Sequence, residues 1–88
     1  MSEGKPARLH LHVVTPRRLL VDAEVDEVRI PGLDGQIGVL PGHQALMLAL
    51  GRGPVIFRSG AAEETFEIDG GTAEIVHDRV LVFTALPE

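Results

Sequence analysis

Glycine and proline interrupt this sequence at short intervals, and only brief apolar runs fit between them. Within those runs every second residue tends to be apolar, which is the period of a half-buried strand. Strands that recur about every eight to twelve residues, separated by glycine or proline turns, are typical of β-sandwiches and barrels. The sequence contains no helical pattern of convincing length. We therefore predict an all-β fold, a two-sheet β-sandwich (a flattened barrel) of short antiparallel strands with no C-terminal helices.

The alternation also predicts how individual strands lie. Residues 8–14 are expected to turn two leucines and a valine inward and the two histidines outward. Val25 and Val28 fall on opposite faces of one expected strand, residues 24–30. We therefore expect a β-bulge near Asp26 and Glu27, which would bring both valines to the same side.

Two glycine-rich stretches are expected to end strands. They are Gly51–Gly53, which precedes a proline, and the pair Gly70–Gly71. Residues 44–50, QALMLAL, stay open between two interpretations. Ala, Leu and Met favour a turn of helix, but the run is also short enough to be a buried strand.

The densest turn chemistry lies in residues 30–43, IPGLDGQIGVLPGH. Gly35 and Gly42 are expected to adopt positive φ, and Pro41 presets φ for the turn beside it. Gly38 lies in a short expected strand, where it would allow a bulge or a close backbone approach. This stretch therefore predicts a tight loop-strand-loop. Its expected turn-shaping residues are Gly32, Gly35, Gly38, Pro41 and Gly42.

Length, charge and composition exclude several classes of function for this chain. Eighty-eight residues are enough for one domain, which we expect to span residues 8–88 after a flexible stretch at 1–7. The net charge of −5 and the scattered basic residues argue against a nucleic-acid partner. No cysteine is present for a disulfide or a thiolate metal site. The apolar runs are too short to span a membrane, and the N-terminus lacks a signal-peptide pattern. We expect a cytoplasmic location without direct membrane insertion.

Candidate chemistry is sparse. His10 and His12 would share one face of a strand, a spacing that can bind a metal. No third ligand lies nearby in the sequence, so we expect a solvated or interface pair and no metal site. Asp34 and His43 could form a carboxylate–imidazole couple, but no nucleophile accompanies them. The glycines of residues 32–38 are not followed by the helix that a phosphate loop needs. We therefore predict no catalytic residue and no cofactor.

Four motifs together resemble one known family. LHLHVVTP, VDEVRIPG, DGQIGVLPGH and the later GGTAEIV are similar, in order and spacing, to the N-terminal β-sandwich domain of the F-type ATP synthase epsilon subunit. The similarity extends from Leu9 to about Leu86. The family's usual loop pattern is matched at Gly35, Gln36, Gly38, Val39, Pro41, Gly42 and His43.

The resemblance implies a function. The domain would sit at the foot of the central stalk, as a non-catalytic rotor subunit that couples ion translocation to ATP synthesis. Its partners would be the gamma subunit, the polar loops of the membrane c-ring and, through gamma, the catalytic alpha/beta head. By position, Asp34, Gln36 and His43 would face the c-ring, and Thr15 would face gamma. The implied location is peripheral, at the cytoplasmic face of the bacterial inner membrane.

The role of the His43 ring stays open between two interpretations. It could tune a partner contact near neutral pH, or it could hydrogen-bond the adjacent Pro-Gly turn.

The chain also departs from the family pattern. The family usually continues into two C-terminal helices, which can inhibit ATP hydrolysis and in some members bind ATP. This sequence stops after Pro87, which cannot extend a helix begun there, so we expect neither property here. Whether the chain is a natural short form or an excised domain stays open. Gly51–Pro54 replaces a commoner Pro-Gly turn, and Gln44 stands where Ala is usual.

Two other functions remain as alternatives. One is a free-standing β-sandwich adaptor outside the synthase. The other is an enzyme that uses Asp34 and His43.

Overall fold

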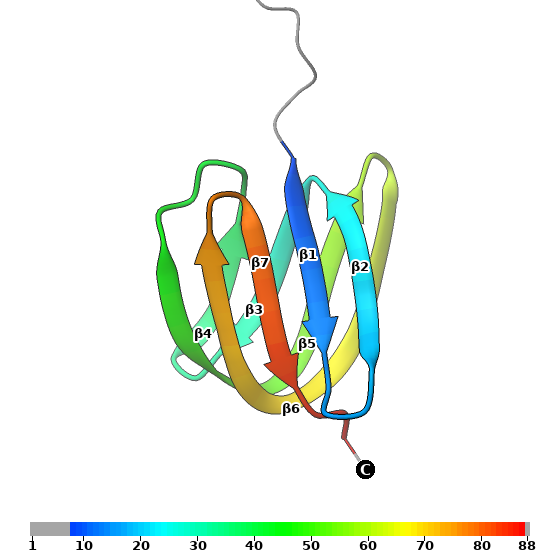
Figure 1. The fold of residues 1–88 in the computed structure, drawn as a ribbon, viewed down its shortest axis with the longest axis vertical. Helices are drawn as coiled ribbons and strands as arrows, with labels where there is room; N and C mark the ends of the chain where they lie inside the picture. Colours follow the sequence, from blue (N-terminus) through cyan, green and yellow to red (C-terminus); the bar gives the residue numbers. More distant parts are fainter. Residues whose placement is uncertain (1–7, 88) are drawn as a thin grey trace, which may run out of the picture.

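The computed structural model describes residues 8–87, which form seven strands and no helix (Figure 1). The expectation of a flexible stretch at residues 1–7 falls outside the described residues. The all-β prediction is confirmed for the described part of the chain. The strands are β1 (Leu9–Val14), β2 (Leu19–Val25), β3 (Glu27–Gly32), β4 (Gly35–Val39), β5 (Leu46–Ser59), β6 (Ala62–Val76) and β7 (Arg79–Thr84).

Hydrogen bonds join the strands in the order β2-β1-β7-β6-β5-β3-β4. This single ladder folds over on itself into two layers, because β5 and β6 are long and curve from one layer into the other (Figure 1). β1 and β2 lie in the same layer as β7, whereas β3 and β4 lie in the opposite layer. β1 pairs with β7 in parallel, so the expectation of antiparallel pairing is wrong at this one ladder.

The two long strands correct the expected strand ends. Gly51–Gly53 and Gly70–Gly71 lie inside β5 and β6, and the β5–β6 pairing keeps one register from end to end. Gly53, Gly70 and Gly71 have positive φ there. The positive φ of these glycines allows the continuous β5–β6 hairpin to bend sharply at this point. The sequence pattern had indicated instead that a strand ends there. Residues 46–50 belong to β5, which settles the open choice in favour of a strand.

The described strands contain neither the bulge expected near Asp26 and Glu27 nor the one that Gly38 would have allowed. Val25 ends β2 and Val28 lies in β3, and these strands are on opposite sides of the sandwich. The parity change at Asp26 is therefore a crossing between layers. Gly38 pairs with Arg29 in an uninterrupted β3–β4 register, so no bulge forms at Gly38. A Cβ at this position would lie 3.9 Å from the Arg29 Cγ, in ordinary contact.

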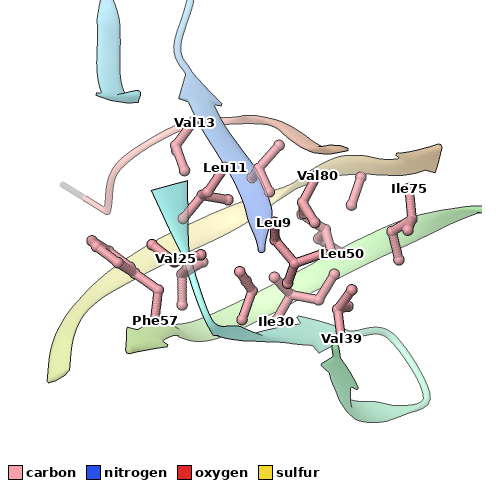
Figure 2. Close-up of a cluster of buried hydrophobic side chains, with 14 of the residues drawn as sticks. Leu9, Leu11, Val13, Val25, Ile30, Val39, Leu50, Phe57, Ile75 and Val80 are labelled. Carbon is pink, nitrogen blue, oxygen red and sulfur yellow. The ribbon is translucent and has the colours of Figure 1, made fainter. Parts of the chain in front are cut away.

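The core lies between the two layers (Figure 2). β1 alternates as predicted, with its two leucines and Val13 buried and its histidines on the outer face. Ile30, Leu50 and Phe57 complete the core from the opposite layer. A fully buried side chain of this size contributes about 1.5–3 kcal/mol relative to an exposed one, so this layer-to-layer packing is the main source of stability.

Asp26 joins the two layers where the chain crosses between them. Its Oδ2 accepts a hydrogen bond from the Gly60 backbone N–H at 2.7 Å, and its Oδ1 accepts one from Arg8 Nε at 3.2 Å. Arg58 Nη1 lies 3.7 Å from the same carboxylate. The Gly60 N–H is the largest cause that lowers the Asp26 pKa, and the charges of Arg8 and Arg58 add to it against an opposing effect of burial. The carboxylate is therefore bound most strongly in its ionised form.

We expect Asp26→Asn to unfold at a lower temperature than the wild type at pH 7. Since the folded-state pKa of Asp26 is lowered, its contribution is fully present above its ordinary value of 3.8 and is lost as the pH falls below it. The difference in melting temperature should therefore shrink in acid. Thermal unfolding followed by circular dichroism between pH 7 and pH 3 would measure it. Asp69→Asn is the control, because the Asp69 side chain forms no ion pair or hydrogen bond with the described residues. An Asp26→Asn difference that is the same at every pH would contradict the prediction.

Candidate functional site

The β3–β4 hairpin carries the stretch with the densest turn chemistry. Leu33 and Asp34 form its turn, and Gly32 pairs with Gly35 at its base. The Leu33 N–H donates to the Ala49 carbonyl of β5 at 3.2 Å, which ties the turn to the neighbouring strand. The turn is therefore held by pairing within the hairpin and by a hydrogen bond to β5.

Gly32 allows this turn to be tight. A Cβ at Gly32 would lie 2.8 Å from the Gly35 carbonyl oxygen and 3.3 Å from Leu48 Cδ1. Any other residue would force the turn apart. Gly35 has φ 130° and Gly42 has φ 88°, which confirms the positive φ predicted at both positions.

Three side chains at this turn form an exposed surface, which we name the hairpin tip: Leu33, Asp34 and Gln36. Leu33 is 68% exposed. Contact with another molecule would remove this apolar surface from water. Beside it lies a shallow depression of about 310 Å³, which reaches from the turn to Leu48 and Ala49 of β5. The hairpin tip therefore combines apolar, acidic and amide groups on a fixed backbone.

His43 lies at the other end of β4, in the loop before β5 (Figure 1). Its N–H donates to the Leu40 carbonyl at 3.1 Å, and its Nδ1 donates to the Gln44 carbonyl at 2.7 Å. The Gly42 N–H donates to Asp78 Oδ1 at 2.7 Å, which ties this loop to the β6–β7 turn. The backbone of His43 thus closes the Pro-Gly turn, while its ring holds the next carbonyl.

The structure therefore separates the residues that the sequence grouped. The five residues of β4 lie between Asp34 and His43, a span of about 16 Å. Asp34 and Gln36 share the hairpin tip, but His43 does not lie on that surface. For the same reason Asp34 and His43 form no carboxylate–imidazole couple. The enzyme alternative required these two side chains to be in contact.

Thr15 shapes the loop between β1 and β2. Its Oγ1 accepts hydrogen bonds from the N–H groups of Arg17 and Arg18 at 3.2 Å each. In Figure 1 this loop lies at the same end of the sandwich as the hairpin tip. The Thr15 hydroxyl is thus used in hydrogen bonds within its own loop, and its main effect is to fix the shape of that loop.

Sequence reasoning missed the exposed apolar residues. Met47 on β5 is 72% exposed and Leu40 is 55% exposed, in addition to Leu33. One signal for Leu33 was available, because a leucine between two turn residues cannot reach the core. Met47 gave no such signal, since its run was compatible with burial.

Among residues 8–87 there is no helix of the length and hydropathy needed to cross a bilayer.

Comparison with known proteins relates this chain to one protein family. Residues 8–86 match the family described as "ATP synthase, Delta/Epsilon chain, beta-sandwich domain". The ATP synthase epsilon chain of Solibacter usitatus is 39% identical over 83 residues, which cover 94% of this chain and 62% of the relative. That of Caulobacter vibrioides is 42% identical over 69 residues, 78% of this chain and 80% of the relative. Epsilon chain 2 of Syntrophotalea carbinolica is 40% identical over 92% of this chain and 59% of its own length.

Solved structures agree with the sequence comparison. A chain of the Euglena gracilis mitochondrial ATP synthase (OSCP/F1/c-ring in rotational state 1) superposes with a TM-score of 0.83 at 25% identity, over 94% of this chain and 54% of that one. A chain of the Tetrahymena thermophila mitochondrial ATP synthase central stalk and c-ring has a TM-score of 0.74 at 12% identity, which shows the fold alone. The present chain spans about 60% of the length of several curated relatives. With its match over residues 8–86 and its sandwich of seven strands, the protein belongs to the ATP synthase delta/epsilon chain family, as a beta-sandwich domain.

Proposed function

We propose that this protein is a non-catalytic epsilon-type subunit of an F-type ATP synthase, in which it links the gamma subunit to the membrane c-ring in the central stalk. The observation that carries the proposal is the family match over residues 8–86. Residues 8–88 would act as one rigid domain, peripheral to the membrane at the cytoplasmic face of the bacterial inner membrane. The role is mechanical, because rotation is transmitted through the domain and no reaction occurs on it.

The hairpin tip is the surface that we assign to the c-ring. Asp34 and Gln36 present a carboxylate and an amide to polar loops, and the exposed Leu33 offers an apolar centre. The close packing at Gly32 and the Leu33–Ala49 hydrogen bond hold these groups in place before binding. Such preorganisation lowers the entropy lost on association. His43 is left out of this contact, because it lies at the opposite end of β4.

The gamma contact is assigned to the loop that contains Thr15. Arg17, Arg18 and Leu20 line a depression of about 500 Å³ beside this loop, together with Leu86. Apolar side chains beside two basic ones suit a partner surface that carries apolar and acidic residues. The alpha/beta head would then be reached through gamma.

An affinity capture tests the proposal as a whole. The 88-residue chain is immobilised and exposed to detergent-solubilised membranes of its own host. Recovery of gamma with the catalytic subunits supports the rotor function. A folded chain that recovers no gamma would instead support a free-standing adaptor, and the hairpin tip would then need another partner.

We expect the double substitution Asp34→Lys and Gln36→Lys to weaken c-ring binding about tenfold or more, which corresponds to about 1.4 kcal/mol. The reason is that two cations replace the groups that the proposal directs at the ring. ATP-driven proton pumping in inverted vesicles that are reconstituted with each variant would report the loss of coupling.

The control carries the same change in charge elsewhere. Glu67→Lys with Ala62→Lys alters two exposed positions of β6, outside the hairpin tip and outside the depressions beside Thr15. Pumping by the hairpin-tip variant at the wild-type rate, or an equal loss in the control, would count against the assignment of the c-ring surface.

A further inference from the structure

Two histidines and an aspartate meet on the outer face of the sandwich. His10 and His12 stand on β1, and Asp22 stands on the edge strand β2. Asp22 is directly opposite His12 in the β1–β2 register and one step diagonal from His10. One ligand atom from each of the three residues lies within 4.8 Å of the others. The third ligand that the sequence did not reveal is therefore supplied by strand pairing.

A single carboxylate oxygen organises the cluster. His10 Nε2 donates to Asp22 Oδ1 at 2.5 Å, and His12 Nε2 lies 3.4 Å from the same oxygen. The two imidazole rings are stacked, with centroids 4.3 Å apart and planes only 9° apart. Both Nε2 atoms are thus aimed at one point from the same side.

The second ring nitrogen of His12 has no partner among the described residues. This atom, Nδ1, is buried, and no described residue fixes the tautomer of that ring by bonding to it.

We propose that His10, His12 and Asp22 form a binding site for a divalent first-row transition-metal ion of the Zn²⁺ class. Imidazole nitrogen and carboxylate oxygen are the ligands that such ions take, at about 2.0–2.2 Å. Ligand atoms around a tetrahedral ion lie roughly 3.4 Å apart, so small side-chain rotations close the present spacing without moving either strand. Three protein ligands leave a position for water or a fourth group.

The neighbouring charges permit this site. Glu24 on β2 and Arg79 on β7 pair with His10 from its two sides. Because their charges are opposite and cancel, the net charge around the two histidines is that of Asp22. A bound ion would join the edge strand β2 to β1, and it would stabilise the folded chain by an amount that rises with the logarithm of its concentration relative to its dissociation constant.

Titration of the full 88-residue chain with ZnCl₂ by isothermal calorimetry tests the proposal. We expect one ion per chain. Removal of one of three ligands, in His10→Gln, His12→Gln or Asp22→Asn, should weaken binding about tenfold or more. Co²⁺ should give a visible d–d absorption band in the wild type that each of these variants loses.

Two matched controls separate a built site from weak surface binding. His77→Gln removes a histidine of the β6–β7 turn, and Glu64→Gln removes an exposed carboxylate of β6, both outside the three-residue cluster. Both should bind Zn²⁺ as the wild type does. Circular dichroism establishes which variants are folded, and any one folded ligand variant is sufficient for the comparison.

Thermal unfolding gives an independent readout. At one Zn²⁺ concentration, the rise in melting temperature should be larger for the wild type and His77→Gln than for the ligand variants. Equal affinity in the wild type and a folded His10→Gln/His12→Gln double variant would overturn the proposal. The measurements need no synthase partner, so their outcome is independent of the rotor function.

Discussion

We expect Gly71→Ala to destabilise the fold by about 3 kcal/mol or more. Gly71 lies in β6 opposite Thr84 of β7, with φ 119°. A Cβ at this position would overlap the Phe83 carbonyl oxygen and would lie 2.9 Å from the Thr84 Cα. Backbone atoms within a ladder cannot rotate away, so β6 and β7 would have to separate where β6 bends between the layers.

Urea unfolding at equilibrium would measure the loss, and Gly60→Ala is the matched control. Gly60 also has positive φ, at 61°, but a Cβ there would meet no atom within 4 Å. Its substitution should cost only the backbone strain, about 1 kcal/mol. If Gly71→Ala were no more destabilising than Gly60→Ala, the close contact with β7 would not be a determinant of stability.

The second large effect is expected in binding. Leu33→Asp should lower the affinity for the c-ring by about 30-fold, the loss of roughly 2 kcal/mol typical when an apolar anchor is removed from the centre of an interface. Leu33 is 68% exposed in the free chain, so its substitution should change the free energy of unfolding by less than about 0.5 kcal/mol. The affinity should therefore fall while stability stays almost unchanged.

Binding of purified c-ring to the immobilised chain would measure this effect. Met47→Asp is the control, because Met47 is 72% exposed on β5 and receives the same chemical change away from the hairpin tip. Equal c-ring binding by the Leu33→Asp and wild-type chains would show that the hairpin tip is not the contact. Equal loss in both variants would indicate a general effect of added charge.

Local rules were sufficient for much of this fold. The two-residue alternation correctly predicted which side chains of β1 are buried, because facing in a strand depends only on the backbone pleat. Positive φ at Gly35 and Gly42 was also predicted correctly, since a turn is a property of a few consecutive residues. The loop motif of residues 35–43 indicated the family on the same local basis, and the match over residues 8–86 confirms it.

Long-range pairing settled the remainder. The pair Gly70–Gly71 was predicted to form a turn, but it forms a corner inside β6. The strand continues because thirteen residue pairs with β5 extend across this corner in one register. Similarly, Asp34 and His43 are nine positions apart in the sequence, but the extended backbone of β4 holds them at opposite ends of a strand.

The His10, His12 and Asp22 cluster shows the same division. The sequence alone placed the two histidines on one face of a strand, because that follows from the period of two. It did not place Asp22 beside them, since the register of β1 against β2 brings residues ten positions apart into direct opposition. Burial of the two inner faces selects that register, as a slip of one residue would turn every core side chain of β1 outward.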